Sequence, residues 1–110
     1  AGATYPGLAM DSQGNLYVSW EVVPGLSSRP RGLAFTVSRD NGRSFAAPQP
    51  VPGSVDERGG ANGSHQGLLG KKLAVHDDGK IAIVNSSFLP GVRSRVWLMR
   101  GALAGGAPAR

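Results

Sequence analysis

The stretch SRDNGRSF (38–45) holds the residue types of a nucleophilic centre, because serine hydroxyls flank an aspartate carboxylate within a few positions. The same residues also suit a tight turn. Asp40 and Asn41 tolerate turn backbone and can bond their own chain, and Gly42 takes a positive φ without steric strain. The two serines can close the turn through their hydroxyls, and Phe45 can pack back on it as an anchor. We therefore interpret the stretch as a stabilised hairpin turn rather than a catalytic pair.

Arginine dominates the charged residues, with 12 lysines and arginines against 7 acids and a net charge of +5. This balance favours anionic partners such as carboxylated sugars or an acidic protein surface. The charges are scattered, however, and the 2 Trp, 2 Tyr and 3 Phe form no evident stacking platform, so we expect no nucleic-acid partner. No apolar run reaches the length of a membrane span.

The chain has 110 residues and no cysteine, which bounds it to one small domain without disulfides. It begins with Ala1 rather than Met, and we interpret it as a processed piece or a fragment.

The chain resembles itself at a constant offset. LAMDSQGNLYVSW (8–20) aligns with LAVHDDGKIAIVN (73–85), and each copy reads as an apolar strand, a polar turn with glycine, and a second apolar strand. A third strand is expected at LAFTVS (33–38) in one copy and RVWLMR (95–100) in the other, with Phe35 and Trp97 in matching places. Only the first copy has a fourth segment, SFAAPQPV. Helical periodicity is absent, so we predict an all-β repeat protein.

The turn stretch resembles the Asp-box, the short repeat of sialidases and other BNR-repeat β-propellers. It fits the pattern Ser/Thr-x-Asp-x-Gly-x-Ser/Thr-Trp/Phe at every specified position, namely Ser38, Asp40, Gly42, Ser44 and Phe45. It also stands between a third and a fourth strand, where that family places it. The resemblance implies a β-propeller of antiparallel four-stranded blades, about two of which are present, and it covers most of the chain apart from 48–70 and the tail.

The second copy departs from the family pattern, because GALAGGAPAR follows its third strand and lacks the box. We therefore expect an incomplete second blade. The predicted organisation is a first blade at 1–52, a long inter-blade loop at 53–70, a second blade at 71–103 and a flexible tail at 104–110.

Strand direction sorts the connections onto two ends. The turns at 11–15, 38–45 and 76–80 share one end, and the connections at 24–31, 48–70 and 90–95 share the other. In sialidase-like propellers this second end carries the site, where arginines hold a sugar carboxylate because the guanidinium fork matches it bidentately. The candidate ligand-binding residues there are Arg29, Arg31, Asp56, Glu57, Arg58, His65, Arg93 and Arg95, with Asn62 and Gln66 nearby.

No catalytic residue carries over from the family. The Phe/Tyr-Arg-Ile-Pro motif of family sialidases is absent, and neither Tyr5 nor Tyr17 has an evident glutamate partner. His65 and His76 fall on opposite ends, so no metal site is expected, and no cofactor is expected either. The glycine-rich segment around Gly70 lacks the ending of a phosphate loop.

The sequence thus predicts a non-catalytic, sialidase-like propeller segment that contributes protein or glycan contacts to a larger propeller or assembly. Two alternatives stay open: a fragment of an exo-sialidase-type glycoside hydrolase, and a two-blade lectin that closes a ring by oligomerising. The expected partners are further blades or other protein subunits, together with an anionic glycan. Asp-box proteins are often exported, so the resemblance favours a secreted, periplasmic or cell-surface location.

Overall fold

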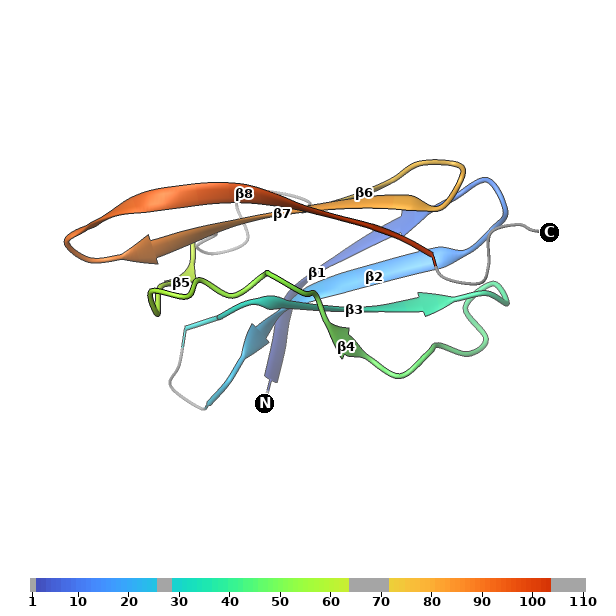
Figure 1. Ribbon diagram of the computed structural model, residues 1–110. Helices are drawn as coiled ribbons and strands as arrows, with labels where there is room; N and C mark the ends of the chain where they lie inside the picture. The colour runs from blue at the N-terminus through green and yellow to red at the C-terminus, as the bar shows by residue number, and fades with distance from the viewer. Residues whose placement is uncertain (1, 26–28, 64–71, 104–110) are drawn as a thin grey trace.

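The computed structural model describes residues 2–25, 29–63 and 72–103, and these ranges form two antiparallel β-sheets without a helix (Figure 1). The first sheet, called sheet A here, follows chain order. It consists of β1 (Gly2–Met10), β2 (Leu16–Val23), β3 (Leu33–Ser38) and β4 (Gln49–Pro50). A bulge interrupts β1 between Thr4 and Gly7, where Tyr5 has a φ of 52°. Of the fourth segment expected from the sequence, SFAAPQPV, only the two residues of β4 form a strand, and they pair with Ala34 and Phe35.

Sheet B is built around one long central strand. Its strands are β5 (Ala61–Asn62), β6 (Leu73–Val75), β7 (Lys80–Leu89) and β8 (Val92–Ala102). The short strands β5 and β6 pair with different parts of β7, and β8 pairs with β7 along most of its length. The fold class is all-β with antiparallel four-stranded sheets, as the sequence predicts.

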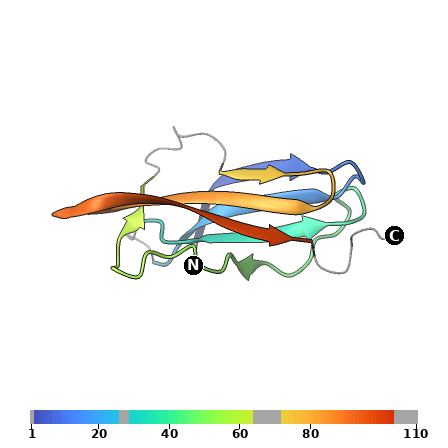
Figure 2. The same cartoon turned by 45° about the horizontal axis from the view of Figure 1, so that its top comes forward.

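The two sheets lie face to face as two layers, and β1 and β6 are neighbours where the layers meet (Figures 1 and 2). Strand alternation sends every second side chain into the gap between the sheets. The buried core takes its side chains from both: Tyr17, Leu33, Val37 and Val51 from sheet A and its edge, and Leu73 and Ile83 from sheet B. Burying this shared face is what holds the sheets together.

Strand register shows which faces of the two repeats correspond. The β1–β2 and β6–β7 hairpins have the same register when residues are offset by 65, because Leu8 pairs with Val18 and Leu73 pairs with Ile83. On the third strand, Trp20 pairs with Ala34 and Asn85 pairs with Trp97. Trp97 therefore corresponds to Ala34, and Leu98 corresponds to Phe35. The predicted match of Phe35 with Trp97 is wrong by one residue.

Because of this correspondence, the two sheets pack head-to-tail, which means that each contributes a different face of the repeated unit to the interface. The side chains of sheet B that face the core belong to Leu73, Val75, Ile81, Ile83 and Asn85. Their counterparts in sheet A are Leu8, Met10, Leu16, Val18 and Trp20, which lie on the face of sheet A that points away from sheet B. The interface thus joins two different faces of the repeated unit, and each sheet leaves the other kind of face outside.

The turns gather at the two ends that strand direction predicts. At one end the β1–β2 turn touches the β6–β7 turn, since Ser12 Oγ donates to the carbonyl of Asp77 at 3.3 Å. The β7–β8 turn and β5 lie at the opposite end (Figure 1). One placement differs from the expectation: β8 begins at Val92, so Arg93 is a strand residue rather than a loop residue, and Arg95 lies inside the strand instead of at its start.

The connection between the sheets is partly buried. Val51, Ser54, Asp56, Ala61 and Asn62 are all buried, and β5 attaches the connection to β7. The part of the predicted 53–70 loop that reaches residue 63 is therefore packed structure, while 64–70 lies outside the described residues, as does the tail from 104.

Candidate functional site

The turn at 38–45 uses its polar side chains on itself. Ser38 Oγ donates to Asp40 Oδ1 at 2.8 Å and accepts the backbone N–H of Gly42 at 2.8 Å. The Asp40 carboxylate also accepts the backbone N–H of Ser44 at 2.9 Å and its hydroxyl at 2.5 Å. Hydrogen bonds from Ser44, followed by the one from Ser38, lower the pKa of Asp40 to about 2. Asp40 is therefore a fully ionised centre of the turn.

Two backbone positions explain why this turn needs its composition. Asn41 and Gly42 have φ values of 63° and 87°, in the left-handed region that Asn and Gly adopt most readily. The aromatic residue of the motif differs from the expectation, because Phe45 is 46% exposed. The described structure thus gives Phe45 no buried anchoring position, and hydrogen bonds hold the turn.

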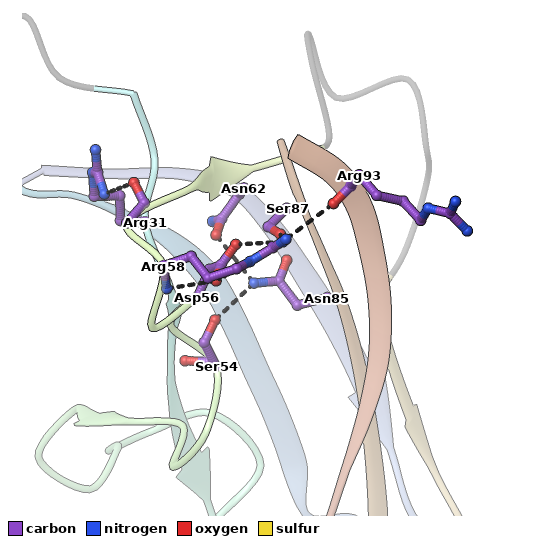
Figure 3. Close-up of polar contacts among 9 residues, drawn as sticks. Arg31, Ser54, Asp56, Arg58, Asn62, Asn85, Ser87 and Arg93 are labelled. Atoms are coloured by element: carbon purple, nitrogen blue, oxygen red, sulfur yellow. Dashed lines mark hydrogen bonds and ion pairs between the residues drawn. The ribbon is translucent and has the colours of Figure 1, made fainter. Parts of the chain in front are cut away.

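Two of the candidate ligand-binding residues, Asp56 and Arg58, form a pair (Figure 3). Arg58 Nη2 lies 3.0 Å from Asp56 Oδ2, and its Nε lies 3.2 Å from Oδ1. The same guanidinium donates to the carbonyl of Arg93 and to Ser87 Oγ. Arg58 and Ser87 together hold the pKa of the Asp56 carboxyl far below its usual range. The pair ties the connection to β7 and β8.

The other arginines contact separate protein groups. Arg31 donates to the carbonyl of Gly59, Arg29 lies over the ring of Phe88 at 5.9 Å, and Arg95 lies over Trp97 at 5.5 Å. The Arg93 side chain points away from the Asp56 carboxylate (Figure 3).

The structure therefore unites Asp56 with Arg58 and does not bring the arginines around one point. Glu57 is exposed. His65 and Gln66 lie outside the described residues.

A buried polar cluster occupies the gap between the sheets, next to these residues. It is formed by Glu21 at the end of β2, Ser54 and Asn62 in the connection, Lys72 before β6, and Asn85 in β7. Lys72 Nζ lies 3.1 Å from Glu21 Oε2 and donates to Asn85 Oδ1 at 2.7 Å. Asn85 in turn donates to Asn62 Oδ1 at 3.0 Å and to the carbonyl of Ser54 at 2.9 Å. The cluster links both sheets and the connection.

Asn62 is the centre of this polar cluster. Its amide accepts the backbone N–H of Gly32 at 2.8 Å and donates to the Gly32 carbonyl at 2.9 Å, as a neighbouring strand would. The same Nδ2 reaches Glu21 Oε1 at 3.1 Å. Among the described residues, no buried side-chain nitrogen or oxygen lacks a hydrogen-bond partner. The cluster is thus a satisfied network, which is the condition under which buried polar groups stabilise one arrangement.

The space beside the polar cluster is small. A hollow of about 20 Å³, lined by Tyr5, Ser19, Glu21 and Lys72 among others, is close to the volume that one water molecule needs. An acid, an amine and two amides are chemically able to bind a polar ligand, but here they bind one another. The arrangement therefore supports positioning of the sheets rather than chemistry on a substrate.

Sequence patterns do not reveal the polar cluster. Asn62 lies 41 positions from Glu21 and 23 from Asn85, so no local motif joins them. The one available signal is a charge at the end of an apolar strand, Glu21 after YVSW, which alternation places on the buried face.

An apolar hollow of about 320 Å³ opens at the outer edge of the interface. Its lining includes Phe35, Val37, Ile83 and Met99 with two arginines, Arg39 and Arg100. It continues the core between β3 and β8, and most of its lining is apolar.

Comparison with known proteins identifies no relative: no family model, no curated protein and no solved structure matches this chain. Within the described ranges, no three His, Asp or Glu side chains group in a way that could hold a metal ion. The same ranges hold no helix of the length and apolarity needed to cross a membrane.

Proposed function

We propose that this chain is a non-catalytic segment of a β-propeller of the Asp-box kind, which serves as a structural and interaction part of a larger propeller or assembly. The observation that carries the proposal is the head-to-tail packing of the two sheets. Propeller blades meet in this way, because the same two faces of the unit are joined at each successive interface. An ordinary β-sandwich does not require that two unlike faces of a repeated unit meet at its interface.

The outer faces give the proposal its function. On sheet A, Leu8 and Met10 are 56% and 62% exposed, and on sheet B Val96 and Leu98 are 73% and 51% exposed. Both pairs stand on strands, so each contributes apolar side chains to the outer face of its sheet. Apolar faces of this kind mark surfaces that another protein covers. The proposed role is therefore to present two faces for docking at opposite sides of the segment.

The proposal is non-catalytic because the side chains that could catalyse a reaction or bind an anion contact other groups of the protein. Ser38 and Asp40 hold a turn, Asp56 neutralises Arg58, and Arg29, Arg31 and Arg95 contact protein groups. An anion site needs guanidinium groups that converge on the ligand. The proposal accordingly places recognition on the sheet faces.

Light scattering coupled to size exclusion tests this proposal on the whole chain over a series of concentrations. We expect association that grows with concentration and persists in high salt, because apolar burial is not screened by ions. We also expect binding of a hydrophobic dye that decreases as the chain associates. A folded chain that stays monomeric at every concentration and binds no dye would contradict the proposal.

A further inference from the structure

The way sheets A and B pack against each other indicates what can pack on their outer faces. Sheet A contributes to that interface the face with Ala9, Tyr17, Leu33, Phe35 and Val37. The register offset gives this face its counterpart in sheet B: Ala74, Ala82, Val96, Leu98 and Arg100. These are the residues that sheet B leaves outside, with Val96 in the place of Leu33 and Leu98 in the place of Phe35.

The outer face of sheet A has the opposite character. Leu8, Met10, Leu16 and Val18 are the counterparts of Leu73, Val75, Ile81 and Ile83, which pack on sheet A within the chain. Large aliphatic residues stand at all of these positions. The outer face of sheet A therefore resembles the face with which sheet B packs on sheet A inside the chain. The outer face of sheet B corresponds by register to the inner face of sheet A, with Ala82 in the place of Tyr17 and Arg100 in the place of Val37.

We infer that the outer face of sheet B binds the outer face of sheet A of a second copy of this chain, in the same head-to-tail arrangement that joins the two sheets internally. The inference rests on the proposed function and names the partner of its docking faces. Such an interface is heterologous, since each copy uses two different patches, and it repeats until the copies close a ring or extend as a filament.

Paired charge variants test this directionality. Leu8→Glu with Met10→Glu blocks the sheet A face, and Val96→Glu with Leu98→Glu blocks the sheet B face. All four side chains are more than half exposed, so the substitutions need not disturb the fold. Circular dichroism and thermal unfolding check this for each variant. Arg43→Gln with Gln13→Glu is a control with the same change of net charge at exposed turn residues.

Light scattering gives the expected result as masses. The wild type and the control associate, each face variant alone is a monomer, and an equimolar mixture of the two face variants forms a dimer that does not grow further. The dimer forms in the mixture because each variant still has the face that the other lacks.

Three outcomes would overturn the inference. A face variant that still dimerises alone would show a like-to-like interface, and a folded mixture that stays monomeric would show that the two faces do not pair. In both cases an associating wild type leaves the proposed function standing. A wild type that is itself a stable monomer would overturn both.

Discussion

Lys72 Nζ lies 3.1 Å from Glu21 Oε2, and this ion pair joins the segment that leads into sheet B to the end of β2 in sheet A. Both side chains are largely buried, and amide groups of Asn85 and Asn62 complete their hydrogen bonds. The relative placement of the sheets, and with it the head-to-tail packing, therefore includes a polar contribution with defined geometry in addition to the apolar core.

Lys72→Met is expected to lower the free energy of unfolding by about 3–5 kcal/mol, because it leaves the Glu21 carboxylate buried without its counter-charge. The double variant Glu21→Leu with Lys72→Met is expected to lose less, since no isolated charge remains. Urea unfolding measures both. Lys80→Met is the control: its ammonium is exposed and 3.6 Å from Asp78, and such pairs contribute at most about 1 kcal/mol. Equal losses for Lys72→Met and Lys80→Met would contradict the role of the buried pair.

Tyr17 gives a second prediction, at the turn between β1 and β2. Its hydroxyl donates to Asp11 Oδ2 at 2.7 Å in the buried interface. Tyr17→Phe removes a hydrogen bond to a charged acceptor and should lower stability by about 1.5–3 kcal/mol, whereas Tyr5→Phe should change it little. Thermal and urea unfolding of the two variants compare them directly. A Tyr17→Phe protein as stable as the wild type would show that Asp11 is held by its other donors alone.

The same tyrosine should titrate abnormally. Burial, followed by the hydrogen bond to Asp11 and the charge of that carboxylate, raises the pKa of Tyr17 above its usual value of 10.0. The folded state thus retains this proton longer than the unfolded state, so stability falls as pH rises above about 10. Tyrosinate absorbance of the Tyr5→Phe variant, which reports Tyr17 alone, should rise only well above pH 10.0 or on unfolding. Ionisation of Tyr17 near pH 10.0 in the folded variant would contradict the buried hydrogen bond.

The turn at 38–45 predicts acid sensitivity. Asp40 has a pKa of about 2 in the folded chain against a usual 3.8, so its stabilising effect is complete above 3.8 and is lost as pH falls toward 2. Melting temperatures measured across this range should fall less steeply in Asp40→Asn than in the wild type. The slope should not vanish, because Asp11, Asp56 and Asp78 also have lowered pKa values. Superimposable slopes would show that Asp40 titrates normally.

Local patterns are sufficient to predict β3 and the two hairpin turns, whereas β5 lies in the stretch expected to be a loop and β1 and β8 begin before the expected strands. Alternating apolar residues and Gly-containing turns predict β3 at its observed bounds, Leu33–Ser38, and both hairpins with their turns. These signals lie within one element or between adjacent ones, where the chain itself enforces proximity. The repeat can be recognised in the sequence because it too consists of such local signals.

The positions that the sequence misplaces depend on distant partners. The connection between β2 and β3 is longer than the two-residue turn between β7 and β8, so aligning by composition matched Phe35 with Trp97 instead of Leu98. Strand direction alone predicts that the arginines at one end share a ligand-binding site, yet Arg58 pairs with Asp56 and Arg95 lies over the ring of Trp97. The polar cluster around Asn62 joins residues far apart in the chain, and no periodicity reports such a contact.

The most direct test of the docking faces is the rate of thiol labelling at single cysteines, which this cysteine-free chain allows without a background. Met10→Cys reports the outer face of sheet A, Leu98→Cys reports the outer face of sheet B, and Gln13→Cys is the control in an exposed turn. Labelling at positions 10 and 98 should slow as chain concentration rises, while labelling at position 13 stays constant, because only the two faces become covered. Rates that are independent of concentration at all three positions in the folded chain would contradict the role of these faces in docking.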